Sequence, residues 1–232
     1  MRKVGMRQPT TGLAFAYDLW HEVRGAEDGP ATCAWHEMAL THLGDVDGVR
    51  LLEAGCGDGG FTRLMAGRGA EVAAFDLSPV AVAQARERSG AEYQVASVTQ
   101  IPYQDESFDL VVCLETLEHV PDWQRGLDEL IRVLRPGGRL IMTTPNYLGP
   151  MGVYRLWLWL KRERYTEMGQ PVNNVTTTVR WWWQLRRRGL KILAVDGRRV
   201  VMPLPGGRFW YLNGLERFRW ICQHGCLVAR KT

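Results

Sequence analysis

One ten-residue stretch, 51–60, constrains the fold more than any other part of the chain. It reads LLEAGCGDGG, so an apolar run leads into Glu53, four glycines follow, and a helical pattern opens at Phe61. Glycine allows backbone conformations and close approaches that other residues do not, so such a turn lets backbone N–H groups at a helix start reach a ligand. The stretch therefore predicts a strand, a ligand-binding turn and a helix, in that order.

The chain from residue 49 onward alternates short apolar runs with helical patterns. Expected strands lie at 49–53, 72–75, 93–96, 108–114, 139–144, 191–195 and 225–230, and expected helices at 61–66, 79–88, 127–134 and 176–188, with a short helix and loop at 206–220. Such alternation is typical of a parallel sheet with helices on its faces. We expect an α/β fold, namely a Rossmann-like, doubly wound, mostly parallel seven-stranded sheet with helices on both faces.

The length of 232 residues suits one domain. We expect an N-terminal helical lid at 1–45, a cofactor-binding core at 46–146, a substrate-covering insert at 147–175, and C-terminal strands and helices at 176–232. The net charge of +4 is small and does not call for a nucleic-acid partner. The five cysteines are odd in number and scattered, which indicates free thiols and a cytoplasmic location.

The glycine turn taken alone fits two kinds of cofactor. The pattern GxGxxG, starting at Gly55, is typical of dinucleotide-binding turns, whereas the pattern ExGxGxG starts at Glu53 and adds a carboxylate. That carboxylate suits the ammonium group of S-adenosylmethionine, and the helix N-terminus suits its carboxylate. Asp76, at the end of the second strand, can accept hydrogen bonds from the ribose hydroxyls of either cofactor, so it does not discriminate between them.

Four segments within residues 51–146 carry a resemblance to a known family. They read LLEAGCGDGG, FDLSPVAVAQA, SFDLVVCLETLEHVPD and RVLRPGGRLIMTTPN, in that order. These segments resemble the class I S-adenosylmethionine-dependent methyltransferases, within them the methyltransferase type 11 group, and most of all the ubiquinone-biosynthesis O-methyltransferases. The resemblance implies methyl transfer from S-adenosylmethionine to a small, hydrophobic or aromatic acceptor, on oxygen, by in-line displacement.

The resemblance also implies roles for single positions. Glu53 and the glycines line the methionine end of the cofactor, Asp76 holds the ribose, and Leu77 lies against the adenine. Ser97 stands where the family usually has an aspartate, so its hydroxyl and the Val98 N–H are expected to bond the adenine. The predicted cofactor residues are Glu53, Gly55, Cys56, Gly57, Gly59, Asp76, Leu77, Ser97, Val98 and Leu114.

The segment 114–120, LETLEHV, is expected at the carboxyl end of the fourth strand, where open α/β sheets bind ligands. By resemblance, His119 is the predicted general base for a hydroxyl acceptor. Glu115, Glu118 and His119 match a segment that the ubiquinone-pathway enzymes associate with a divalent metal, so Mg²⁺ or another divalent ion is one interpretation. In the other interpretation these residues bond backbone or cofactor groups and line the pocket without metal. The predicted acceptor contacts are Tyr17, Glu115 and Trp157.

Residues 151–165 combine tryptophans with basic side chains. Helical spacing puts Val153, Leu156, Trp157 and Leu160 on one face. Three interpretations stay open for this segment: a cover for the acceptor, peripheral association with an anionic membrane surface, or packing on its own domain or in a homodimer. The three consecutive tryptophans at 181–183 cannot all share one helical face, so at least one is exposed, in a pocket or in an interface.

Other functions fit parts of the chain. Basic residues between 161 and 219 could form a track for RNA, which would suit a tRNA or RNA methyltransferase, but the small net charge disfavours nucleic acid. A non-catalytic cofactor-binding protein on the same fold is a further alternative. The glycine turn, Asp76 and His119 favour an enzyme over that alternative, and an NAD-dependent oxidoreductase ranks last.

Overall fold

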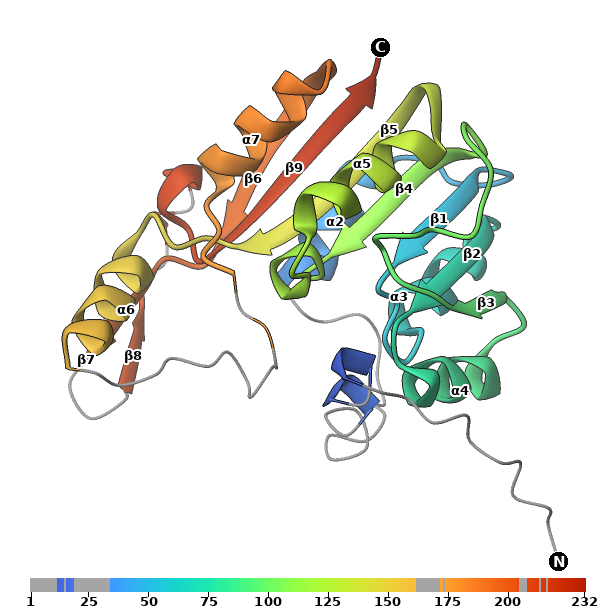
Figure 1. Ribbon diagram of the computed structural model, residues 1–232. Helices are drawn as coiled ribbons and strands as arrows, with labels where there is room; N and C mark the ends of the chain where they lie inside the picture. The colour runs from blue at the N-terminus through green and yellow to red at the C-terminus, as the bar shows by residue number, and fades with distance from the viewer. Residues whose placement is uncertain are drawn as a thin grey trace, which may run out of the picture.

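The computed structural model describes residues 12–14, 16–18, 34–161, 172, 174–204, 208–212, 214, 215 and 217–232. Seven strands form one sheet in the order β3-β2-β1-β4-β5-β9-β6 (Figure 1). Their bounds are β1 Arg50–Ala54, β2 Glu71–Asp76, β3 Glu92–Val95, β4 Phe108–Leu114, β5 Leu134–Pro145, β6 Leu190–Arg198 and β9 His224–Lys231. Strands β1 to β5 pair in parallel, and β9 runs antiparallel to β5 and β6. The predicted Rossmann-like, mostly parallel seven-stranded sheet is confirmed.

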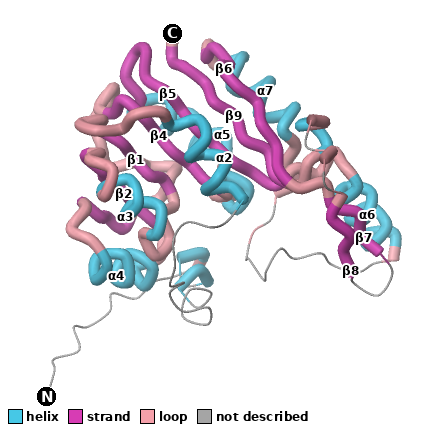
Figure 2. Tube along the Cα trace, turned by 180° about the vertical axis from the view of Figure 1, so that it is seen from behind, coloured by secondary structure: helices cyan, strands magenta, loops and turns pink. Residues whose placement is uncertain are grey.

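Helices cover both faces of this sheet (Figures 1 and 2). Their bounds are α2 Ala34–Leu43, α3 Gly60–Ala66, α4 Pro79–Arg88, α5 Trp123–Val133, α6 Pro150–Leu160 and α7 Thr178–Arg187, with 3-10 turns η1 Leu117–His119 and η2 Arg219–Ile221. One apolar core joins α5 and α7 to the sheet, and a second joins α2 and α3 to the opposite face. Adjacent residues of β1 pack into different cores because side chains alternate across a strand. Leu52 packs into the core with α5 and α7, and Leu51 packs into the core with α2 and α3.

Local sequence explains where several elements begin. Helix α4 starts at Ser78, whose hydroxyl accepts a hydrogen bond from the Ala81 N–H at 3.1 Å, and Pro79 fills the first helical position. Helix α7 buries Trp181 and leaves Trp183 53% exposed. This confirms the prediction that the three consecutive tryptophans cannot all lie on one helical face.

The prediction for residues 206–220 is wrong. Strands β7 (Val201–Leu204) and β8 (Arg208–Tyr211) form an antiparallel hairpin there, followed by η2 rather than a longer helix. The sequences VMPL and RFWY flank Pro-Gly-Gly, and β-branched and aromatic residues on both sides of turn residues favour a hairpin. Of the predicted lid at 1–45, residues 1–11, 15 and 19–33 lie outside the described residues.

The sheet order reverses between β1 and β4. From β1 the chain proceeds outward through β2 and β3, and from β4 it proceeds to the other side through β5. Ligands of open α/β sheets bind outside the carboxyl ends of the strands at such a reversal. The glycine turn follows β1 and the 115–119 segment follows β4, so both flank this point.

Candidate functional site

The glycine turn adopts a conformation that other residues resist. Gly55, Gly57 and Gly59 have φ values of +78°, +53° and +79°, all in the left-handed region. The N–H groups of Gly55 and Cys56 both donate to the Phe75 carbonyl, at 2.9 and 3.0 Å, which ties the turn to the end of β2. A Cβ added at Gly55 would collide with the Thr116 side chain. The turn is therefore a backbone cradle with no room for side chains at its first glycine.

Asp76 holds this cradle and the next helix together. One carboxylate oxygen accepts the Gly57 N–H at 2.9 Å, and the other accepts the Ser78 N–H at 2.9 Å. A carboxylate offers about four acceptor positions, so two remain for further donors. The position and this spare capacity suit a ribose diol, the role predicted for Asp76.

Glu53 is buried beneath the turn. It is 3% exposed, and its carboxyl accepts a hydrogen bond from the Thr62 hydroxyl on α3. Burial raises the pKa of Glu53 to about 8, the Thr62 hydrogen bond opposes this rise, and the charges of Asp76 and Asp58 add to it. The carboxyl is therefore largely protonated at neutral pH until a cation, such as the predicted ammonium group, comes near.

This raised pKa predicts a pH-dependent stability. Between the ordinary pKa of glutamate and about 8, the unfolded chain has released the Glu53 proton and the folded chain still holds it. The free energy of unfolding should therefore fall as pH rises through that window, by at most about 1.4 kcal/mol per pH unit from this group. Urea unfolding without cofactor from pH 5 to 8 should show this slope in the wild type and a shallower slope in Glu53→Gln. Parallel curves for the two proteins would contradict it.

The residues predicted for the adenine end are engaged within their own turn. The Ser97 hydroxyl lies 2.8 Å from the Thr99 hydroxyl and accepts the Thr99 N–H at 3.2 Å. Val98 is buried in the core. Leu77 is half-buried, while Leu114 is buried at the end of β4, where its carbonyl accepts the Thr116 hydroxyl at 2.9 Å. The contacts of Leu77, Ser97 and Val98 with an adenine and the contact of Leu114 with the cofactor stay predictions.

His119 is held in a defined orientation. Its Nδ1 lies 2.7 Å from the Val172 carbonyl oxygen. A carbonyl only accepts hydrogen bonds, so Nδ1 carries the proton and Nε2 of the neutral ring is the acceptor. That Nε2 lies 3.7 Å from a carboxylate oxygen of Glu118, which is buried. This tautomer leaves Nε2 suited to take a proton.

Two residues of the N-terminal region reach this edge of the sheet. The Tyr17 hydroxyl donates to the His119 carbonyl at 3.2 Å, and burial, then the charges of Glu118 and Asp76, raise its pKa. The Asp18 carboxylate accepts the Ser78 hydroxyl at 2.6 Å and the Val80 N–H at 3.2 Å. This part of the predicted lid thus bridges the start of α4 and the 115–119 segment. No local pattern marks Asp18, so the sequence analysis missed it.

The structure does not assemble the predicted metal triad. Among the residues that it describes, no three His, Cys, Asp or Glu side chains are arranged to hold a metal ion. Glu115 leaves β4 with a φ of +46°, and its carboxylate lies 3.1 Å from His224 Nδ1 on β9, while Glu118 lies beside His119. His224 is 109 residues from Glu115, so only the sheet pairing reveals this contact.

Trp157 does not lie with the other predicted site residues. It is on α6, is 44% exposed, and stacks on Tyr154 with ring centres 5.7 Å apart. Figures 1 and 2 both show α6 with the β7–β8 hairpin beyond the ends of β5 and β9, away from α3 and α4. Its predicted role as an acceptor contact has no support from this placement.

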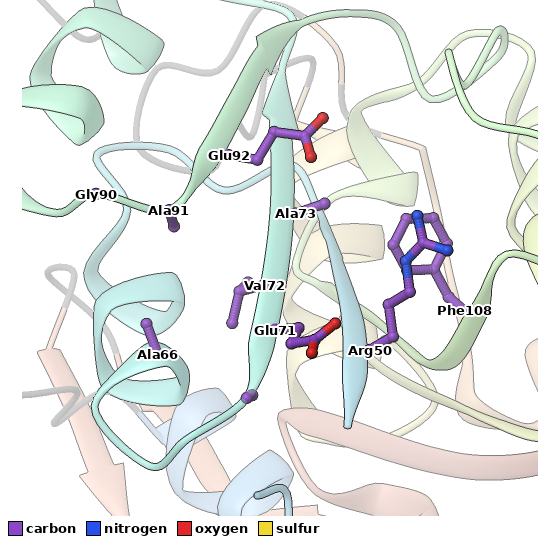
Figure 3. Close-up of a pocket in the computed structure, with 10 residues that line it drawn as sticks. Arg50, Ala66, Glu71, Val72, Ala73, Gly90, Ala91, Glu92 and Phe108 are labelled. Atoms are coloured by element: carbon purple, nitrogen blue, oxygen red, sulfur yellow. The ribbon is translucent and has the colours of Figure 1, made fainter. Parts of the chain in front are cut away.

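A hollow of about 540 Å³ lies elsewhere on the sheet (Figure 3). Its lining includes Arg50, Glu71, Glu92 and Phe108, which begin β1, β2, β3 and β4, and the Arg50 guanidinium lies 5.2 Å from the Phe108 ring centre. These are the amino ends of the strands, opposite the glycine turn. The hollow is therefore separate from the candidate site.

Comparison with known proteins agrees with the geometry. Residues 52–142, which include the glycine turn, Asp76 and His119, match the family model described as "Methyltransferase domain". This segment is a methyltransferase domain. The ubiquinone biosynthesis O-methyltransferase of Xanthomonas oryzae pv. oryzae (strain PXO99A) is 44% identical over 108 residues, which cover 44% of this chain and 45% of that enzyme.

Two further comparisons extend this result. The chloroplastic tocopherol O-methyltransferase of Arabidopsis thaliana is 39% identical over 103 residues, 41% of this chain and 30% of that enzyme. The chain thus spans less than half the length of these curated relatives. A crystal structure of an S-adenosylmethionine-dependent methyltransferase from Mesorhizobium loti superposes with a TM-score of 0.65 at 21% identity, covering 88% of this chain and 100% of that one. The methyltransferase domain therefore has the fold of such enzymes.

Within the described residues, none of the helices has both the length and the apolar character required to cross a membrane.

Proposed function

We propose that this chain transfers a methyl group from S-adenosylmethionine to an oxygen of a small, hydrophobic or aromatic acceptor. The observation that carries the proposal is the juxtaposition at one sheet edge of the glycine cradle, Asp76 and a histidine whose Nε2 can accept a proton. The names of the curated relatives, O-methyltransferases in both cases, support oxygen as the methylated atom.

The described residues suit the cofactor. The cradle would admit close approach to its backbone because Gly55, Gly57 and Gly59 carry no side chains and adopt positive φ values. Asp76 would accept the ribose hydroxyls with its two remaining acceptor positions. Glu53 would ionise beside the ammonium group, since a nearby cation lowers the pKa of a buried carboxyl. When bound, the cofactor supplies a methyl group already activated on a sulfonium.

The protein's remaining task is alignment and proton removal. In-line displacement needs the acceptor oxygen held in position and water excluded. His119 Nε2 would take the hydroxyl proton as the new O–C bond forms, and the Glu118 carboxylate 3.7 Å away would stabilise the resulting imidazolium. The Val172 carbonyl holds Nδ1 and thereby prevents the ring from turning its protonated nitrogen to the acceptor. These roles follow the interpretation in which Glu115, Glu118 and His119 line the pocket without metal.

The acceptor can be found by mass spectrometry. Pools of phenols, quinols, lipids and tRNA are incubated with the protein and S-adenosylmethionine, with and without EDTA. We expect a phenol or quinol to gain one CH₂ in net mass, equally in both buffers. Methylation of tRNA alone would favour the RNA alternative, and loss of the product in EDTA would restore the metal interpretation.

We also propose that the reaction takes place in the cytoplasm. Cys56, Cys113, Cys222 and Cys226 are buried free thiols. Free thiols are typical of a reducing compartment.

A further inference from the structure

Helix α6 turns its apolar face to solvent. The residues that helical spacing puts on one face are Val153, Leu156, Trp157 and Leu160, and they are 70%, 57%, 44% and 67% exposed. Trp159, on the adjoining side, is 70% exposed. An amphipathic helix of a globular domain normally buries such a stripe against the core. Here the stripe, which we call the α6 apolar face, is uncovered.

The orientation of α6 is fixed by its contacts on the other side. Met151 and Leu158 are its buried residues, and the helix packs beside β7. The start of α6 packs closely against neighbouring backbone. A Cβ at Gly149 would collide with the Ile221 backbone, and a Cβ at Gly152 would collide with the Tyr147 backbone. Rotation of the helix to bury the apolar face would break these contacts. The exposure is therefore a property of the packing.

The neighbouring hairpin adds to this surface. Met202 of β7 and Trp210 of β8 are directly paired across the two strands, so they lie on the same side of the hairpin. They are 39% and 61% exposed. Figures 1 and 2 show the hairpin beside α6 at the same end of the molecule. Large apolar side chains that gather in this way mark an interaction site.

The described charged residues of α6 and of the position directly after it are both positive, namely Arg155 and Lys161. The sequence of α6, PMGVYRLWLWL, contains no acidic residue. Lys161 follows it with Nζ 4.0 Å from the Trp157 ring centre, whereas the Arg155 guanidinium lies 4.4 Å from the Tyr147 ring centre and has a buried nitrogen. Exposed tryptophan and leucine followed by a lysine suit the boundary between lipid headgroups and acyl chains.

We propose that α6 docks on an anionic lipid surface, lying in the plane of the interface with its apolar face in the acyl boundary. A helix of 11 residues spans about 16 Å, too short to cross a bilayer. With Met202 and Trp210 of the hairpin, the described surface has seven exposed apolar side chains, against the roughly 20 to 30 residues per side that a stable protein dimer buries. The Lys161 ammonium beside Trp157 would attract anionic headgroups. This inference goes beyond the proposed methyl transfer and does not depend on it.

Vesicle flotation of the full chain tests the proposal. We expect the wild type to float with vesicles of equal parts phosphatidylcholine and phosphatidylglycerol, and to remain behind with phosphatidylcholine alone. Flotation should weaken at high salt because screening reduces the attraction to the headgroups. The double variant Trp159→Ala/Leu160→Ala should bind the anionic vesicles at least about 10-fold more weakly, since it removes apolar area that the acyl boundary would bury.

Trp183→Ala is the matched control. Trp183 is 53% exposed on α7 and has the Arg187 guanidinium 4.9 Å from its ring centre, so it repeats the tryptophan–cation pair at another place on the surface. This variant should float like the wild type. The proposal would be overturned if the wild type did not float with anionic vesicles. It would also be overturned if Trp183→Ala lost as much vesicle binding as the double variant, or if the double variant bound like the wild type. A dimer in sedimentation that the double variant abolishes, without flotation, would assign the face to a second copy instead.

Measurement of S-adenosylmethionine affinity separates this proposal from the proposed function. The wild type, the double variant and Trp183→Ala should bind the cofactor equally in calorimetry, because none of the changed residues touches the glycine turn. Lipid binding without cofactor binding would support the docking surface and reject the proposed methyltransferase activity. Cofactor binding without lipid binding would support the methyltransferase activity and reject the docking surface.

Discussion

His119→Ala is expected to lower methyl transfer to a hydroxyl acceptor by at least about 100-fold, the low end for loss of a general base. The affinity for S-adenosylmethionine should stay near that of the wild type, since His119 lies in the segment after β4 and not in the glycine turn. The physical reason is the fixed tautomer. Nδ1 is held at 2.7 Å from the Val172 carbonyl, so Nε2 is the nitrogen that can accept the proton.

Turnover and calorimetric affinity should be measured on the same preparations, with the acceptor that the mass-spectrometric screen identifies. His42→Ala is the matched control, because the His42 ring also pairs with a carboxylate, Asp196, at 3.3 Å but lies between α2 and β6. It should transfer methyl groups at the wild-type rate. An unchanged rate in His119→Ala would reject His119 as the base.

Asp76→Ala is expected to weaken S-adenosylmethionine binding at least about 100-fold, equivalent to about 2.7 kcal/mol. The change removes the proposed ribose acceptor, and it also leaves the Gly57 and Ser78 N–H groups without their 2.9 Å partners. Hydrogen bonds to a charged group contribute about 1.5–3 kcal/mol each. The free energy of unfolding should therefore fall as well, by about 3 kcal/mol.

Asp58→Ala controls for charge in the same turn. Asp58 pairs with Arg88 at 2.6 Å, and their side chains are only 22% and 17% exposed. Loss of this one charged hydrogen bond should lower the free energy of unfolding by about 1.5 kcal/mol, less than the loss of two in Asp76→Ala. Calorimetry should show cofactor affinity within a few-fold of the wild type in this control. If Asp76→Ala bound the cofactor as tightly as Asp58→Ala does, the ribose role of Asp76 would be rejected. Urea unfolding of both variants distinguishes a lost contact from a collapsed turn.

The sheet was predictable because its signals are local. The run 108–114 is apolar apart from Asp109, and it forms β4 at those bounds, since a central parallel strand is buried on both faces. The helix start at Ser78 and Pro79 needed only capping chemistry. The β7–β8 hairpin was missed although its turn residues were visible, because aromatic residues in short runs fit a helix or a strand equally well by periodicity.

The candidate site was predictable only in part. The glycine turn and Asp76 follow from a spacing that local backbone geometry enforces. Glu115 pairs with His224, which is 109 positions away, and Asp18 contacts the start of α4, which is at least 60 positions away. No local pattern in the sequence encodes either contact. The two interpretations of Glu115, Glu118 and His119 could not be separated from the sequence for the same reason, since His224 of β9 lies 3.1 Å from the Glu115 carboxylate.

By itself, the sequence indicated the positions of the apolar runs and the glycine cradle, because both depend on residues close together in the chain. It indicated the class of cofactor only through four segments spread over residues 51–146. Only the tertiary structure decided the His119 tautomer, through a carbonyl 53 residues away, and the partner of Glu115. The tertiary structure also decided which way the apolar face of α6 points. Hydrophobic periodicity shows that a helix has an apolar face, but the contacts of Met151 and Leu158 determine that this face points outward.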